Sequence, residues 1–109
     1  MKKLYILFIT ITFSFNIYSQ DGFQERAKKI SSEMSMVLSL DSETSKKVYH
    51  IQLKRFIEAQ RIRNEHQNNK RLMNVELKKL QNRLWGSLNG VLGQEKMKSW
   101  NAYKKTNYN

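Results

Sequence analysis

Apolar residues between Val48 and Ile62 recur at helical spacing and form two adjacent stripes. The span of residues 41–90 contains no proline, and winding it at roughly 100° per residue separates the two sets. The first stripe contains Val48, Ile51, Ala59 and Ile62, and the second contains Tyr49, Leu53, Phe56 and Ile57. A helix in a simple hairpin buries a single apolar stripe. The second stripe therefore requires another helix, another subunit or a bound ligand.

A seam of apolar residues in the next segment predicts the partner of the first stripe. From about Lys70 to Asn89 a second helix is expected, because its apolar residues and the one just beyond it are three or four apart: Met73, Leu77, Leu80, Leu84, Leu88 and Val91. Asn68 and Asn69 favour a turn, since asparagine tolerates the left-handed conformation. A reversal there would place Ile62 near Met73 and Val75, Ala59 near Leu77 and Leu80, and Val48 near Leu88. The alternative is one unbroken long helix.

A shorter helix is predicted on each side of this hairpin. Residues 23–38 repeat apolar side chains every three or four positions, and residues 94–105 place Met97, Trp100 and Tyr103 on one side. Asp41 or Ser42 can cap the first hairpin helix, which we expect to begin at about residue 42. The pattern thus predicts an all-α fold of four helices, a long antiparallel hairpin flanked by a short N-terminal and a short C-terminal helix.

The connections to these flanking helices contain two leucines and two glycines. Leu40 precedes the expected cap and can pack on the following turn, and Leu92 can do the same for the last helix. Gly90 and Gly93 suit a helix stop and restart. Residues 106–109 are expected to fray.

The first twenty residues have the layout of a secretory signal peptide. Lys2 and Lys3 precede an apolar run over residues 4–15, and polar residues follow. We expect cleavage near Ser19, so that residues 1–19 are removed and residues 20–109 form a single exported domain. The alternative is an uncleaved membrane anchor, which is disfavoured because the run is shorter than the roughly 20 apolar residues that span a bilayer. The absence of cysteine excludes a lipid-modified anchor.

The chain is strongly basic, with 20 Lys and Arg against nine Asp and Glu and a formal charge of +11. Removing Lys2 and Lys3 leaves 18 basic residues against nine acidic ones, a charge of +9. This excess favours acidic proteins, anionic lipid, lipopolysaccharide or nucleic acid as partners, and export argues against nucleic acid. A small domain without disulfides would also gain stability from forming a homodimer.

Catalytic and metal-binding patterns are missing from the sequence. It has no Gly-x-Ser-x-Gly, phosphate-binding glycine loop or His-Glu-x-x-His, so we expect neither an enzyme nor a cofactor. His50 and His66 are sixteen residues apart, which does not suit a metal site. Arg55 falls within the first stripe and must either reach solvent or find a carboxylate.

The second stripe is the candidate contact surface. Its four apolar residues, Tyr49, Leu53, Phe56 and Ile57, are bordered by Lys46, Gln52, Gln60 and Arg63. The simplest interpretation is that the first or last helix covers the stripe. A dimer contact or a surface that binds other proteins is the alternative.

The order of these features resembles the Spy/CpxP-like periplasmic proteins, which carry two Leu-Thr-x-x-Gln motifs at helix starts. The corresponding segments are Leu40-Asp41-Ser42-Glu43-Thr44 and Leu92-Gly93-Gln94-Glu95-Lys96. Each keeps the leucine, Asp41 supplies a capping residue in place of threonine, and neither keeps the glutamine. The similarity in helix order extends over residues 23–105.

This resemblance implies a cradle-shaped antiparallel homodimer whose basic concave face holds non-native envelope proteins or docks on a stress sensor. From it we expect an ATP-independent, holdase-like chaperone. The alternatives are a regulatory partner of an envelope stress sensor and a binder of anionic lipid or lipopolysaccharide. The client or dimer contacts would come from Tyr49, Leu53, Phe56, Ile57, Lys46 and Arg63.

Overall fold

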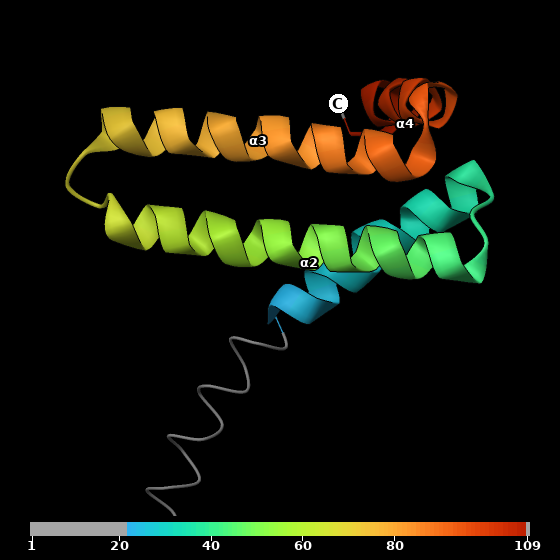
Figure 1. Cartoon of the computed structure of the whole chain (residues 1–109), viewed down its shortest axis with the longest axis horizontal. Coiled ribbons are helices and arrows are strands. Elements are labelled where there is room, and N and C mark those ends of the chain that lie inside the picture. The colour runs from blue at the N-terminus through green and yellow to red at the C-terminus, as the bar shows by residue number, and fades with distance from the viewer. Residues whose placement is uncertain (1–21, 109) are drawn as a thin grey trace, which may run out of the picture.

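The computed structural model describes residues 22–108 (Figure 1). Within that range it is all-helical, with a helix over residues 22–38, α2 (Ser42–Glu65), α3 (Lys70–Leu92) and α4 (Gln94–Asn107). This confirms the predicted long hairpin with a shorter helix on each side. The predicted signal peptide, residues 1–19, lies outside the described residues.

Helices α2 and α3 lie side by side and antiparallel (Figure 1). A turn at residues 66–69 joins them, and the Asn69 side chain accepts a hydrogen bond from the backbone N–H of Leu72 at 3.1 Å. Asparagine in this position satisfies one of the N–H groups that a helix start leaves unpaired. The turn predicted at Asn68 and Asn69 is therefore confirmed, and the single long helix is excluded.

The first stripe of α2 packs against the seam of α3 in two clusters. The larger cluster draws on all four helices and contains Met34, Leu38, Val48, Leu84, Leu88, Leu92, Met97 and Trp100. The smaller cluster, nearer the turn, contains Ala59, Ile62 and Leu80, with Met73 and Leu77 beside them. The predicted pairing is thus confirmed except at Val75, which is 45% exposed because it lies off the seam.

The N-terminal helix ends in a left-handed cap and turns back against α2. Ser39 has φ +53°, and the Leu40 N–H donates to the Ser35 carbonyl at 3.0 Å, the six-to-one bond of a Schellman motif. Asp41 then caps α2 by accepting from the Thr44 N–H at 2.7 Å. The helix, blue to teal in Figure 1, runs obliquely behind α2.

Two expectations about the C-terminal part were wrong. Gly90 lies inside α3 and does not end it, because a continued helix keeps Leu88 and Leu92 on the same buried side. The helical conformation is interrupted between α3 and α4 at Gly93 alone, which has φ +86°. Fraying from residue 106 was also predicted, but α4 continues to Asn107, and the hydroxyl of the next residue, Tyr108, donates a hydrogen bond to Glu33.

Candidate interaction surface

The N-terminal helix covers part of the second stripe of α2. The residue at the centre of this contact is Gln52, which is only 1% exposed. Its amide nitrogen donates to the sulfur of Met34 at 3.6 Å, and its amide oxygen accepts from Arg55 at 3.1 Å. The buried side of α2 therefore extends toward Gln52, which the sequence placed at the border of the stripe.

Phe56 lies beneath two guanidinium groups. Arg26 of the N-terminal helix is 4.4 Å from the ring centroid, and Arg55 is 4.7 Å from it. Cations at this distance are attracted to the negative face of an aromatic ring. Phe56 thus helps to hold the N-terminal helix, and it is a less accessible contact residue than the sequence suggested.

The remaining apolar residues of the stripe keep part of their surface in solvent. Tyr49 and Leu53 are half-buried, and Ile57 is 49% exposed. The Tyr49 ring meets His50 edge-on at 5.3 Å between centroids. The second stripe is therefore partly exposed, with Ile57 as its most exposed apolar side chain.

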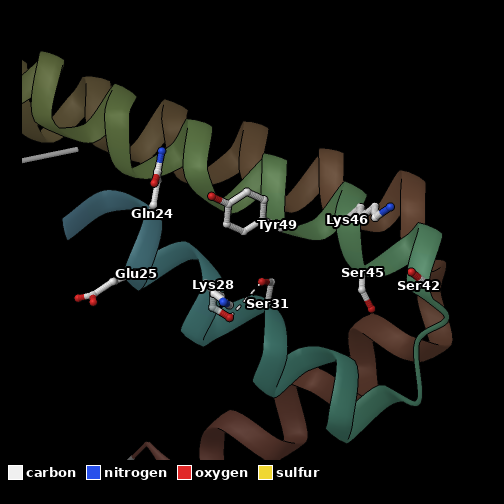
Figure 2. A pocket seen from close by; sticks show the side chains of 8 residues that line it. All are labelled: Gln24, Glu25, Lys28, Ser31, Ser42, Ser45, Lys46 and Tyr49. Atoms are coloured by element: carbon white, nitrogen blue, oxygen red, sulfur yellow. Dashed lines mark hydrogen bonds between the residues drawn. The ribbon is translucent and has the colours of Figure 1, made fainter. Parts of the chain in front are cut away.

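A groove of about 670 Å³ lies between the N-terminal helix and α2, and Figure 2 shows the residues that line it. Tyr49 lies between the two helices in this view, and Lys46 follows on the same side of α2. The groove also contains Gln24, Glu25, Lys28, Ser31, Ser42 and Ser45. The structure thus brings Tyr49 and Lys46 together, whereas Leu53, Ile57 and Arg63 lie further along α2.

Small residues set the close approach of these two helices. Ala27 is fully buried, and the hydroxyls of Ser35 and Ser45 are 2.6 Å apart. Ala27, Ser31 and Ser35 are spaced by four in the sequence, which puts them on one face of the helix. This spacing was the sequence signal that could have located the contact.

The positive charges of this surface have few negative neighbours. Within residues 22–108 the ion pairs are Arg61 with Glu58 and Glu65, and Lys79 with Glu76. Lys46, Arg55 and Arg63 therefore have no carboxylate partner in that range. Burial lowers the pKa of Arg55 from its ordinary value, and the charges of Arg26 and Arg63 lower it further.

The sequence predicts that Arg55 either reaches solvent or pairs with a carboxylate, and within residues 22–108 it does neither. It is half-buried, donates to the Gln52 amide and stacks on Phe56. Both of these contacts are weaker for a cation than a carboxylate would be.

The first two residues of each degenerate motif segment lie at a helix start, with Asp41 and Gly93 at the N-cap positions of α2 and α4. Leu40 packs on the larger cluster, and Leu92 is buried beside Met97, five residues ahead in the sequence, as in a hydrophobic staple. The Thr44 N–H lowers the pKa of the Asp41 carboxyl most, and the charge of Lys96 in the second motif lowers it further. The two motif segments are therefore close enough in space to interact electrostatically.

The described part of the chain contains neither a metal-binding cluster nor a helix able to span a membrane. No group of three or more His, Cys, Asp or Glu side chains in residues 22–108 is placed to hold a metal ion. His50 is exposed, and His66 lies in the turn between α2 and α3. No helix in the same range is long and apolar enough to cross a bilayer.

No protein family, curated protein or solved structure matches this chain. The Spy/CpxP-like resemblance rests on the motif segments and the order of the helices, and it stays a prediction.

Proposed function

We propose that this protein is an exported, basic helical binding protein that holds non-native proteins in the periplasm without ATP. One observation carries the proposal. The second stripe of α2 keeps apolar side chains partly in solvent, with Ile57 49% exposed, beside cations that have no carboxylate partner in residues 22–108. Such a surface can contact the apolar and acidic segments that an unfolded protein exposes.

The two kinds of side chain have different roles in the proposed binding. Tyr49, Leu53 and Ile57 provide weak, non-directional apolar contact, which tolerates many sequences. Lys46 and Arg63 provide a positive field that speeds encounter with acidic segments. Holding of this kind needs no bond to be made or broken.

A homodimer is part of the proposal. A second copy would extend the basic surface into a cradle, as the resemblance implies, and would leave Ile57 accessible to the client. Sedimentation of the purified protein tests this directly. A monomer at all concentrations would remove the cradle and leave only a single binding face.

The activity is tested by the aggregation of an unfolding client. Reduced α-lactalbumin is acidic and aggregates when its disulfides are broken, and light scattering follows the process. Purified protein in stoichiometric excess should slow the rise in scattering without nucleotide. An unchanged rise would contradict holding.

Two other functions would give different results in companion experiments. A regulatory partner would retain one specific acidic sensor protein from envelope extracts, whereas a holding protein retains many unrelated ones. A lipid binder would sediment with vesicles in proportion to their anionic lipid. Vesicle binding that is insensitive to lipid charge would remove that alternative.

A further inference from the structure

A second cavity lies where all four helices meet, apart from the groove of Figure 2. It has a volume of about 240 Å³. Apolar side chains from three helices line it, including Ile30 of the N-terminal helix, Leu88 of α3 and Met97 of α4. Trp85 and Trp100 also line it. Gln52, Gln81, Leu84 and Tyr108 complete the lining, and Trp85 is 43% exposed. The cavity therefore combines an apolar and aromatic part with a few polar groups, as small-molecule sites commonly do.

Two cations also face this cavity, Arg55 of α2 and Lys104 of α4. Burial lowers the pKa of both, and the charge of Arg55 further lowers that of Lys104, so the two groups lie near each other. Neither forms an ion pair within residues 22–108. Two neighbouring positive charges that are partly desolvated and unpaired repel each other, so an anion bound between them would be strongly favoured.

Arg55 also has donors to spare. Its Nη1 donates to the Gln52 amide oxygen at 3.1 Å, and the guanidinium carries further N–H groups in a planar fork. That fork matches the two oxygens of a carboxylate. The ammonium of Lys104 can supply a third donor from the α4 side.

We propose that this cavity binds a small amphipathic monocarboxylate, with its carboxylate at Arg55 and Lys104 and its apolar body against Ile30, Leu88 and the two tryptophans. A water-sized group of atoms occupies ~30 Å³, so the cavity holds about eight non-hydrogen atoms. A straight-chain acid of six carbons has this size. The proposal goes beyond the holding function, because the cavity lies apart from Tyr49, Leu53 and Ile57 of the second stripe.

The chain carries its own reporter of this binding. Trp85 and Trp100 are its two tryptophans, and both line the cavity. Their fluorescence is measured while purified protein is titrated with sodium hexanoate, 1-hexanol or hexylamine. Hexanoate should give a saturable change, hexanol should bind at least tenfold more weakly, and hexylamine should give no saturable change.

Matched variants separate the cavity cations from the general positive charge. Arg55→Met and Lys104→Met should each weaken hexanoate binding about tenfold, because each removes a charge-assisted hydrogen bond. Arg71→Met and Lys105→Met remove exposed cations outside the cavity and should leave binding within twofold. Circular dichroism checks that each variant keeps its helicity, and Arg55→Lys keeps a charge at the site and should recover part of the affinity lost in Arg55→Met.

Chain length tests the apolar part of the site. Affinity should rise about tenfold from butanoate to hexanoate, because two more methylenes are buried, and should level off beyond hexanoate, when the cavity is full. The proposal is overturned by equal affinities for hexanoate and hexanol, by hexanoate binding that both cavity variants leave unchanged, or by the absence of a saturable signal. Client holding is measured by scattering with no carboxylate added, so failure of one proposal is distinguishable from failure of the other.

Discussion

The hydroxyl of Tyr103 donates a hydrogen bond to Oε2 of Glu33 at 2.6 Å and links α4 to the N-terminal helix, 70 residues apart in the chain. Tyr108 donates to the other oxygen of the same carboxylate. The Tyr103 ring also stacks on Trp100, with centroids 5.4 Å apart. Glu33 thus joins the two flanking helices, which pack on the central hairpin through the larger cluster.

This link makes stability sensitive to acid. The hydrogen bonds from Tyr103 and then Tyr108 lower the pKa of Glu33 below its ordinary value near 4.5. Its contribution is therefore fully present above that value and is lost as the pH falls through the folded pKa. The difference in Tm between the natural protein and Glu33→Gln should shrink from about pH 6 to about pH 3.

Thermal unfolding followed by circular dichroism measures this difference. Glu25→Gln, at an exposed position of the same helix, is the control. A constant difference for Glu33→Gln across the range would mean that the charge of Glu33 does not contribute.

The contact between Tyr108 and Glu33 predicts that one tyrosine loses its proton at an unusually high pH. Burial raises the pKa of Tyr108 to about 12, with the Glu33 hydrogen bond adding to the shift. Its contribution to stability is present below its ordinary pKa and is lost as the pH rises through about 12. Tyrosinate absorbance should show a step near that pH, and Tyr108→Phe should remove it. Tyr49→Phe is the control, and a step that survives in Tyr108→Phe would contradict the assignment.

Two glycines should respond in opposite directions to the same substitution. Gly93 has φ +86°, a conformation that a side chain disfavours, so Gly93→Ala should destabilise the fold by about 1–3 kcal/mol. Gly90 is helical, and a Cβ there meets no atom within 4 Å, so Gly90→Ala should stabilise by about 0.5–1 kcal/mol. Urea unfolding of both variants measures these changes. Equal destabilisation would contradict the assignment of Gly93 as the break between α3 and α4.

The larger cluster should carry most of the stability. Leu88 is buried among residues of all four helices, so Leu88→Ala should destabilise by about 2–5 kcal/mol. Leu72→Ala, at an exposed position of the same helix, should stay within about 0.5 kcal/mol. Urea unfolding distinguishes the two, and similar values would mean that the cluster does not form the core.

The sequence predicted the hairpin well because its periodicity is regular. Val48 and Ile62 on one helix and Leu80 to Leu88 on the other are spaced for a single seam, and Asn69 marks the turn. The burial of Gln52 was not predicted, because a polar side chain gives no apolar signal. Its side chain contacts Met34, which lies on the N-terminal helix, and Arg55, which lies on the next turn of α2.

The C-terminal end of α4 and the cavity between the four helices could not be predicted from the sequence for a related reason. Tyr108 is held by Glu33, a contact across 75 residues that local propensity does not encode. Arg55 could be recognised as an anomaly within an apolar stripe, but its neighbour Lys104 depends on the packing of α4. Contacts between helices distant in the chain therefore set both the surface and the cavity.

The central claim is that the second stripe of α2 binds unfolded protein, and a matched pair of variants tests it most directly. Ile57 and Val75 are exposed to 49% and 45%, and they lie on α2 and α3. Ile57→Ser should weaken the suppression of α-lactalbumin aggregation several-fold while helicity is retained, and Val75→Ser should leave it unchanged. Equal suppression by both variants and the natural protein would contradict the claim.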